Sequence, residues 1–467
     1  MSSHTTHPNR FMAVISHYRI EIIIFILALV IRLMFLVGFA PEQKNYDALA
    51  DQYIYLDMGR NLIAGKGFSV TNPIFVADPG PTALEPPAYP LFIAVIMKTF
   101  GENFLAIRVI QAILSALTCV ITYKIGQRVL SETPARVGAL ILCLYPPLIM
   151  YVRPFMSETL FIFTMPLAVL WTLRLLEKLS VLNSIIAGVC WIIAYYTRME
   201  AVAFAGVTAL YGLFILRRNY RQKPLWGIAY MIPGAIVFLL ALSPWIIRNY
   251  QLFHRFMPTN STSGFNLWQL NYSRYYVDQD PNFYPTDMKP EYKDVPNWNS
   301  LDEPERDDAL WRLASDWIRE HPTTYLYYSL TRINVSFPII PRSSEFTTPT
   351  LLQPDLDFTA IDEFPLYNTP AERLRIWSFR ILFVCALLGI IQAIRQKQWS
   401  VALLLLLLGV NVVRAAFIQG RERARIFTDP YMILFAANFL VAFYYYVKRT
   451  RINKSSQQIE TGKAHEI

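Results

Sequence analysis

The stretch NYDALADQYIYLDMGRNLIAGKGF, residues 45–68, decides the fold together with LEPPAYP at residues 84–90. It follows an apolar run at 20–39 that is long enough to cross a bilayer as a helix. Residues 47–62 suit a helix, and Asp47 and Asp51 lie four apart, which puts both carboxylates on one helix face. The prolines at 86 and 87 then turn the chain back toward the membrane. The sequence therefore predicts an acidic first loop at a membrane surface.

Composition decides the class of protein. Of the 467 residues, 54% are hydrophobic and only 16% are charged, which ordinary soluble domains do not show. The net charge of +9 comes from short clusters of Lys and Arg between apolar runs, so it indicates topology signals and no nucleic-acid partner. The four cysteines all lie in apolar runs, which argues against a disulfide framework. The sequence predicts an all-helical, multi-pass membrane protein whose partner is the lipid bilayer.

Hydropathy predicts about ten transmembrane helices, because roughly 20 mostly apolar residues cross the hydrocarbon. These spans lie near 20–39, 104–123, 135–151, 155–176, 181–196, 199–216, 226–247, 377–394, 399–418 and 428–447. The first span contains Arg32 and is followed by many others, so it is interpreted as an uncleaved helix rather than a signal peptide.

Basic residues predict the orientation of these spans. If the spans alternate, one side collects Lys124, Arg128, Arg136, Arg174, Lys178, Arg217, Arg218, Arg221, Lys223, Arg395, Lys397, Lys448, Arg449, Arg451 and Lys454. Cytoplasmic loops carry such an excess, so both termini are predicted to be cytoplasmic. The first loop, 40–90, and the long segment 248–376 are then extracytoplasmic.

Four regions follow from this topology. Residues 1–250 form an N-terminal transmembrane module whose first outer loop, 40–90, carries membrane-parallel helices, and 251–376 form a mixed extracytoplasmic insertion between the seventh and eighth spans. Residues 377–451 supply the C-terminal transmembrane helices, and 452–467 a cytoplasmic tail. Within the insertion, Asp302, Glu303 and Pro304 predict a helix start, and Pro322 predicts its end.

Seven arginines at the outer ends of spans disobey the positive-inside rule: Arg153, Arg198, Arg248, Arg414, Arg421, Arg423 and Arg425. A single such arginine usually reaches headgroup phosphates or pairs with a nearby acid such as Glu200. Seven arginines on the face that also carries the acidic loop indicate a binding site for an anion, because the planar guanidinium binds phosphate in a bidentate manner. We expect a site for a phosphate or pyrophosphate group at the membrane surface.

Glu158, in RPFMSETLFIF at 153–163, lies at the mouth of the fourth span, where an ionisable group is costly unless paired or used. A capping contact with Arg153 or Ser157 and an active-site role explain it equally well. Asp57 and Lys66 are expected to face solvent. Tyr55 and Tyr89 are expected to pack at the interface, with a sugar pocket as the alternative.

One carboxylate and several arginines outside a membrane suit glycosyl transfer from a lipid phosphate. Once cations neutralise it, the phosphate leaves without a general acid, and a single carboxylate can act as base toward the acceptor hydroxyl. The alternative is a multi-span transporter or flippase of a lipid-linked or anionic substrate, which would place paired charges near mid-membrane, often in repeated halves. A structural membrane protein is the third possibility, and it would not need the arginine cluster.

The ordered motifs RNLIAGKGF (60–68), PPAYPLFIA (86–94), IRVIQAIL (107–114), LYPPLIMYVRPFMSETLF (144–161) and PWIIRNY (244–250) resemble those of membrane glycosyltransferases of the C-type fold. Within that fold the chain is similar to the protein O-mannosyltransferase and aminoarabinose transferase-like group, which uses polyprenyl-phosphate sugars. The resemblance covers most of the chain to residue 266, and again 311–332 and 421–431.

The resemblance implies roles for individual residues. Asp51 falls at the position of the first-loop catalytic acid, Asp47 is the fallback, and Glu158 matches an acid at the fourth span. Tyr55 shapes the same loop, and Arg248, Arg421, Arg423 and Arg425 fall where the family handles the lipid phosphate. Tyr89, Arg153 and Arg198 are the remaining candidates for substrate binding. The residue before the Pro-Pro pair is often basic in relatives, but here it is Glu85, which makes Glu85 a second acid beside the substrate.

The resemblance also implies an inverting hexosyl or pentosyl transferase, mannosyltransferase-like, working on the cell envelope. Its partners would be a polyprenyl-phosphate-linked sugar donor and an acceptor glycan, lipid or protein. No cofactor is certain, although some distant relatives need a divalent metal such as Mg or Mn. The implied location is a bacterial inner or archaeal plasma membrane, with the active site extracytoplasmic.

Overall fold

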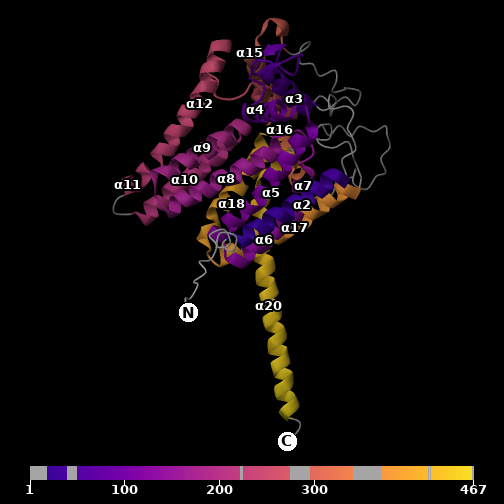
Figure 1. The fold of residues 1–467 in the computed structure, drawn as a ribbon, viewed down its shortest axis with the longest axis vertical. Helices are drawn as coiled ribbons and strands as arrows, with labels where there is room; N and C mark the ends of the chain where they lie inside the picture. Colours follow the sequence, from indigo (N-terminus) through magenta and orange to yellow (C-terminus); the bar gives the residue numbers. More distant parts are fainter. Residues whose placement is uncertain are drawn as a thin grey trace, which may run out of the picture.

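The computed structural model of the chain describes residues 18–38, 50–220, 224–273, 295–339, 370–418, 420 and 422–464. In these residues the protein is helical apart from one antiparallel pair of two-residue strands, β1 (Ser69–Val70) and β2 (Gly80–Pro81), with Ser69 opposite Pro81. The helices gather into one bundle, and the last of them extends far beyond it (Figure 1). The all-helical, multi-pass fold predicted from composition is thereby confirmed.

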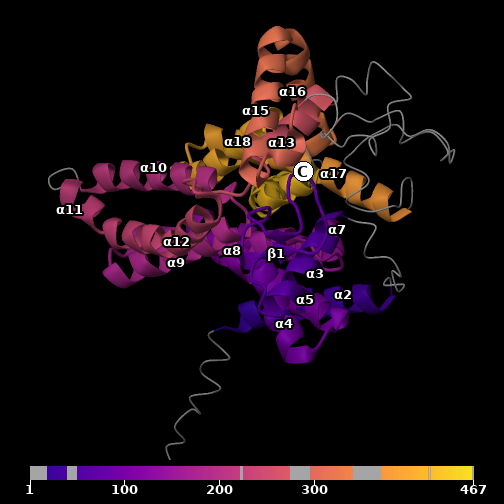
Figure 2. The same ribbon diagram turned by 90° about the horizontal axis from the view of Figure 1, so that it is seen from above.

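The bundle is built from long apolar helices. They are α2 (Arg19–Gly38), α5 (Phe104–Val129), α6 (Glu132–Leu144), α8 (Ser157–Glu177), α9 (Val181–Thr197), α10 (Ala201–Asn219), α12 (Ile232–Phe253), α17 (Pro370–Arg395), α18 (Ala402–Phe417) and α20 (Asp429–Ala464). The short helices α7 (Pro146–Met150) and α11 (Pro224–Ala229) join some of them. In Figure 2, α9, α10, α11 and α12 extend to one side of the rest.

Eight helices, not ten, are long and apolar enough to cross a membrane in the described part of the chain. The predicted span 135–151 is wrong, because Pro146 and Pro147 follow the end of α6 at Leu144 and start the separate helix α7. With 13 residues, α6 rises only about 20 Å against the roughly 30 Å of hydrocarbon. The other short one is α9, with 17 residues. The remaining eight predicted spans each have a matching helix.

The main core lies between α5, α6, α8, α17 and α20. Phe161 of α8 packs edge-on against Phe427, with ring centroids 4.6 Å apart, just before α20 begins. α17 and α20 approach so closely that a Cβ added at Gly389 would lie 2.0 Å from the Phe435 carbonyl oxygen. The C-terminal helices are therefore locked onto the N-terminal module, which brings the segment around residue 423 beside α8.

One end of the bundle is covered by α3 (Ala50–Ile63), α4 (Ala88–Phe100), α13 (Ser263–Trp268), α15 (Glu303–Glu320) and α16 (Pro322–Ser336), seen at the top of Figure 1. We call this the loop end. A second core joins its parts, with Ile54 and Met58 of α3 packed among Phe265, Trp298 and Leu310. The first loop and the described part of the insertion thus form one packed unit.

The predicted limits of α15 are confirmed. Asp302 caps the helix: its side chain accepts from the Glu305 amide at 2.8 Å, and the Glu305 side chain accepts from the Asp302 amide at 3.0 Å. Pro322 starts the next helix. The prediction that Asp57 faces solvent is wrong, because this carboxylate is buried under the β1 turn; Lys66 is exposed as predicted.

Candidate active site

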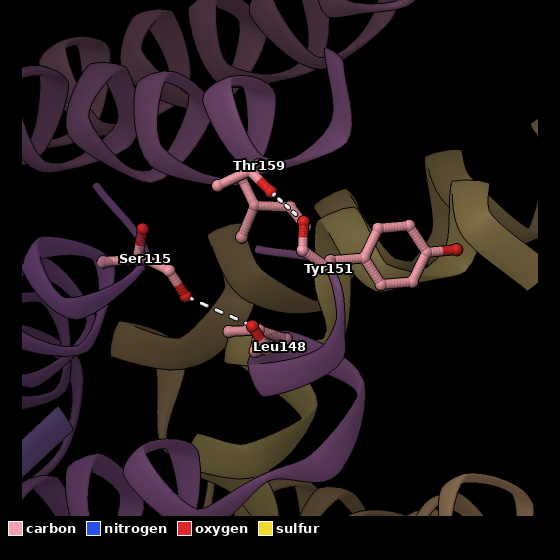
Figure 3. A pocket seen from close by; sticks show the side chains of 6 residues that line it. Ser115, Leu148, Tyr151 and Thr159 are labelled. Carbon is pink, nitrogen blue, oxygen red and sulfur yellow. Dashed lines mark hydrogen bonds between the residues drawn. The ribbon is translucent and has the colours of Figure 1, made fainter. Parts of the chain in front are cut away.

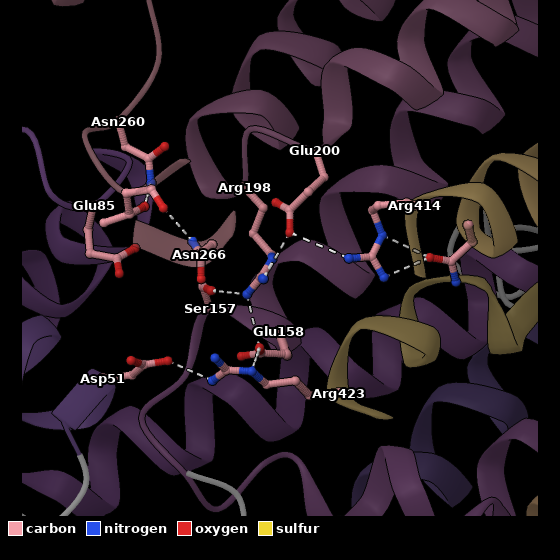
Figure 4. A network of polar contacts seen from close by, with 12 residues as sticks. Asp51, Glu85, Ser157, Glu158, Arg198, Glu200, Asn260, Asn266, Arg414 and Arg423 are labelled. Atoms are coloured by element: carbon pink, nitrogen blue, oxygen red, sulfur yellow. Dashed lines mark hydrogen bonds and ion pairs between the residues drawn. The ribbon is translucent and has the colours of Figure 1, made fainter. Parts of the chain in front are cut away.

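At the loop end, acids and arginines from six parts of the chain meet in one cluster (Figure 4). We call it the charged cluster: Asp51 and Tyr55 of α3, Glu85, Ser157 and Glu158 at the start of α8, Arg198 and Glu200 between α9 and α10, Arg414 of α18, and Arg423 of α19 (Glu422–Arg425). The sequence placed several of these residues on one side of the membrane; the fold brings them into contact.

Asp51 and Arg423 form the contact that joins the first loop to the C-terminal part of the chain. Arg423 Nη1 donates to Asp51 Oδ2 at 2.6 Å, across 372 positions of sequence. The two side chains are 17% and 5% exposed, so the ion pair is largely shielded from water. A charge-assisted bond of this length in such a setting is a strong one.

Glu158 is fully buried between two arginines. Arg198 Nη1 donates to Glu158 Oε1 at 2.9 Å, and Arg423 Nε lies 3.8 Å from the same oxygen. The position of Glu158 in the first turn of α8 also favours a negative charge. Its other oxygen, Oε2, has no hydrogen-bond partner among the residues that the structure describes. The Arg153 contact considered from sequence is not the one formed.

Arg198 donates hydrogen bonds to three residues of the charged cluster, one of them the Glu158 contact given above. It donates to Ser157 Oγ at 3.0 Å through Nη1 and to Glu200 Oε1 at 3.0 Å through Nη2. Burial alone would lower the pKa of Arg198, but Glu200 and Glu158 outweigh that effect and raise it. Burial likewise raises the pKa of Glu200, but the facing Arg198 and Arg414 reverse this and hold it at about 2. Both side chains are therefore charged at neutral pH.

A second, hydrogen-bonded branch leads from Ser157 to Glu85. The Tyr55 hydroxyl donates to Glu85 Oε2 at 3.0 Å and lies 3.2 Å from Ser157 Oγ. Burial, and next the negative charge of Asp51, raise the pKa of Glu85 to about 8, although Tyr55 and two arginines oppose them. Tyr89 packs edge-on behind Tyr55, at 4.7 Å between ring centroids, and donates to Gln111 Oε1 at 2.8 Å. Tyr89 therefore supports Tyr55.

Other predicted site residues lie elsewhere. Arg248 donates to the Phe68 carbonyl at 2.8 Å and to Asn249 Oδ1 at 2.9 Å, which ties α12 to the first loop. Arg425 is buried against the Phe379 ring at 3.7 Å, with Asp429 Oδ1 3.3 Å from its Nε. Half-buried Arg153 accepts from Arg108 through its backbone carbonyl at 3.1 Å. Asp47 and Arg421 lie outside the described residues.

Ser157 and Glu200 were not assigned to the site from sequence, and Arg414 was predicted only as one of the seven outer arginines. Ser157 bridges Tyr55 and Arg198, Glu200 balances Arg198, and Arg414 lies 4.0 Å from Glu200 while donating to Asn411 Oδ1 at 3.0 and 3.1 Å. The available signal was local: Ser157 precedes Glu158, and Glu200 lies two residues after Arg198. The sequence could not predict that α18 packs close enough to bring Arg414 beside Glu200.

The described residues contain no group of three or more His, Cys, Asp and Glu side chains placed to hold a metal ion. In the charged cluster the carboxylates alternate with guanidinium groups, so they do not converge on one point as the oxygen ligands of Mg²⁺ or Mn²⁺ would. A separate pocket lined by Ser115, Leu148, Tyr151 and Thr159 is visible in Figure 3, but it has no room for even a water molecule. It is a packing defect and no substrate site.

Fold and cluster together define a multi-pass membrane protein with a shielded acid–arginine site at one end of its bundle. Residues 84–247 match the family described as dolichyl-phosphate-mannose-protein mannosyltransferase. The segment contains Glu85, Ser157, Glu158, Arg198 and Glu200. The resemblance to C-type-fold membrane glycosyltransferases is thereby confirmed. No curated protein matches the chain significantly.

Two solved structures of one archaeal enzyme share the fold of this chain. The apo oligosaccharyltransferase of Archaeoglobus fulgidus is similar, with a TM-score of 0.55 and 13% identity over 93% of this chain. The same archaeal enzyme with an inhibitory peptide and a dolichol-phosphate gives 0.54, with 12% identity over 95% of this chain. In both comparisons the chain spans about half, 52%, of the archaeal protein. ArnT of Cupriavidus metallidurans bound to undecaprenyl phosphate gives 0.37, with 14% identity over 91% of this chain and 78% of that one.

Proposed function

We propose that this protein is an inverting membrane glycosyltransferase that moves a sugar from a polyprenyl-phosphate-linked donor to an acceptor on the extracytoplasmic face. The observation that carries the proposal is the meeting of Asp51 with Arg423 and Glu158 in one shielded cluster. The family description, which names a dolichyl-phosphate-linked mannose donor, supports the donor class. The acceptor class is a glycan, lipid or protein carrying a free hydroxyl.

The reaction is a single displacement at the anomeric carbon. The acceptor hydroxyl oxygen attacks that carbon and forms the new glycosidic bond, while the bond from the anomeric carbon to the phosphate oxygen breaks. The electron pair of the broken bond goes to the lipid phosphate, and the hydroxyl proton goes to Asp51 as general base. One displacement inverts the configuration at the anomeric carbon.

Arginines stabilise the charge that develops on the leaving phosphate. Arg423 and Arg198 are fixed by carboxylates before the substrate arrives, so little reorganisation is needed during the reaction. Their planar donors suit phosphate oxygens. Because the charged cluster is largely closed to water, each interaction is stronger than it would be on an exposed surface.

Glu158 is proposed to orient the substrate. A buried carboxylate oxygen without a hydrogen-bond partner is costly, and its persistence indicates a donor that is present only in the complex. A hydroxyl of the transferred sugar suits Glu158 Oε2. Glu85, which accepts a hydrogen bond from the Tyr55 hydroxyl, is proposed to contact the same sugar.

The positive-inside pattern supports an extracytoplasmic active site in a bacterial inner or archaeal plasma membrane. The predicted topology puts Asp51 and the basic residues that follow the second span on opposite sides of the membrane. These basic residues are Lys124 and Arg128, near the C-terminal end of α5, and Arg136, in α6. The donor lipid would then enter from the outer leaflet.

A deletion strain tests the proposal. Its lipid extract should accumulate a polyprenyl-phosphate sugar, identified by mass spectrometry, and the wild-type chain should clear it. Asp51→Asn should fail to clear it, because loss of a general base lowers turnover by about 10²- to 10⁴-fold. Asp308→Asn, which removes an exposed charge paired with Arg255, is the matched control and should clear the lipid normally. Normal turnover by well-expressed Asp51→Asn protein would remove the role assigned to Asp51.

A further inference from the structure

We propose that α16 lies in the lipid leaflet at the loop end, with Leu326, Tyr327 and Leu330 in contact with acyl chains, while the adjoining helix α15 faces water. The proposal depends on the membrane-spanning fold and is independent of the proposed reaction. Its starting point is that α16 turns apolar side chains outward, the reverse of what a surface helix in water shows.

The two faces of α16 have opposite character. Leu326, Tyr327 and Leu330 share one face at helical spacing, and each of them is more than half exposed. The inward face carries Ser329 and Arg332, both buried. Arg332 Nη2 donates to Ser329 Oγ at 2.9 Å, so these polar groups are partnered inside the protein. A helix with its apolar face outward and its polar face inward suits a surrounding of lipid.

The preceding helix, α15, shows the ordinary pattern of a helix in water. Its inward face carries Leu310, Ala314 and Trp317, all buried. Trp311 is exposed, as tryptophans at a membrane–water interface often are. The other exposed residues of α15 are charged: Asp308, Arg312, Asp316, Arg319 and Glu320. The boundary between water and lipid therefore falls at the turn between the two helices.

The outward face of α16 continues the lipid-facing surface of α18. The helix Trp399–Phe417 is long and apolar enough to cross a membrane, and Val413 and Phe417, near its loop end, are exposed. The Tyr325 ring of α16 packs beside Phe417, with ring centroids 6.4 Å apart, and its hydroxyl donates to the Phe417 carbonyl at 3.3 Å. In Figure 2, α15 and α16 project from the bundle beside α18. This continuity favours acyl chains as the cover of α16.

This placement links the leaflet to the charged cluster. Arg332, on the inward face of α16, donates to the Ala416 carbonyl at 2.9 Å through Nε and packs against Gly420, three residues before Arg423. The membrane contact of α16 therefore supports the segment that leads to Arg423.

Spin labelling of the full chain in phosphatidylcholine nanodiscs tests the proposal. A nitroxide attached to Leu326→Cys should be relaxed by oxygen, which concentrates among acyl chains, and should be shielded from a water-soluble nickel chelate. Asp316→Cys, on the exposed side of α15, is the matched control and should show the reverse order. Wild type treated with the same label supplies the background, since its four cysteines are buried or half-buried.

The ratio of oxygen to nickel relaxation should be higher at Leu326 than at Asp316. Nickel relaxation at Leu326 equal to that at Asp316 would place this face of α16 in water and overturn the proposal. A label at Leu326 that neither reagent reaches would place the face against protein, a second copy of the chain or another partner, and would overturn it too. Leu330→Cys, one turn further along the same face, repeats the measurement if Leu326→Cys does not fold. None of these outcomes depends on donor binding, so the proposed function is tested separately.

Discussion

The Asp57 carboxylate accepts two hydrogen bonds from Thr71, one from the backbone amide to Oδ2 and one from the hydroxyl to Oδ1, each 2.7 Å long. Asp57 lies six residues after Asp51 in α3 but points away from the charged cluster, toward the turn that follows β1. The two acids of α3 therefore have different partners: Asp57 is hydrogen-bonded to Thr71 within the first loop, and Asp51 is paired with Arg423.

Asp57→Asn should consequently lower stability rather than catalysis. An amide cannot accept both bonds from Thr71, and loss of one buried acceptor costs about 1–3 kcal/mol. Turnover per folded molecule should stay close to wild type, in contrast to Asp51→Asn. Thermal unfolding in detergent and a donor-clearance assay separate the two effects. Strong loss of turnover without loss of stability would show that Asp57 belongs to the reaction.

This pair illustrates what the sequence can predict. Helical spacing and the preceding apolar run are local features, so they place Asp51 and Asp57 on a helix at the membrane surface. Whether an acid faces solvent depends on the partner that packs above it. Thr71 contacts Asp57 because the chain turns back over α3 after β1, and the sequence of α3 does not predict this turn. The expectation that Asp57 faces solvent was wrong for that reason.

The same limit applies to the arginines. Counting the spans alone predicts that Arg198 and Arg423 lie on the same side of the membrane as Asp51. Which arginines enter the charged cluster depends on tertiary packing: Arg425, two residues from Arg423, is instead buried against Phe379.

Glu85 should make stability depend on pH. Burial and the charge of Asp51 raise its pKa to about 8, against the opposing effects of Tyr55, Arg198 and Arg423. Between its ordinary value of 4.5 and about 8, the folded protein therefore holds one proton more than the unfolded chain. This contribution to stability is complete at the acid end of the window, declines as pH rises through it, and is gone above about 8.

Glu85→Gln should remove that decline, because an amide does not titrate. Unfolding temperatures of wild type and Glu85→Gln, measured across the window, should diverge as pH changes, and the wild-type value should fall as pH rises. Asp308→Asn serves as the control, since it removes one exposed carboxylate that is paired with Arg255. Parallel curves for wild type and Glu85→Gln would contradict the raised pKa.

Gly420, three residues before Arg423, packs closely against Arg332. A Cβ at Gly420 would lie 2.3 Å from the Cβ of Arg332, closer than side-chain atoms approach. Arg332 cannot easily yield, because its guanidinium donates to the Ala416 and Leu270 carbonyls at 2.9 and 3.1 Å. Gly420→Ala must therefore displace the segment leading to Arg423, three residues on.

We expect Gly420→Ala to weaken polyprenyl-phosphate binding and turnover about ten-fold or more, since a misplacement of about 1 Å can cost that much or more. Gly409→Ala is the matched control: a Cβ at Gly409 of α18 meets nothing within 4 Å, and the change should be tolerated. Binding of undecaprenyl phosphate to the two variants decides the matter. Equal affinity of both would show that the close approach at Gly420 has no bearing on the site.

Glu158 and Arg198 should behave as a coupled buried pair. Arg198→Gln leaves a fully buried carboxylate with only the 3.8 Å contact to Arg423, and breaking a buried pair in this way typically costs about 3–5 kcal/mol. Glu158→Gln removes the charge instead, so the double variant should recover much of the stability that Arg198→Gln loses.

The double-mutant cycle in detergent unfolding measures this coupling directly, and a coupling energy near zero would contradict the ion pair. Turnover gives an independent answer, because neutralising Glu158 cannot restore what the proposed reaction needs from Arg198. The double variant should thus be stable but inactive. Recovered turnover would mean that Arg198 serves only to balance Glu158, and the leaving phosphate would then depend on Arg423 alone.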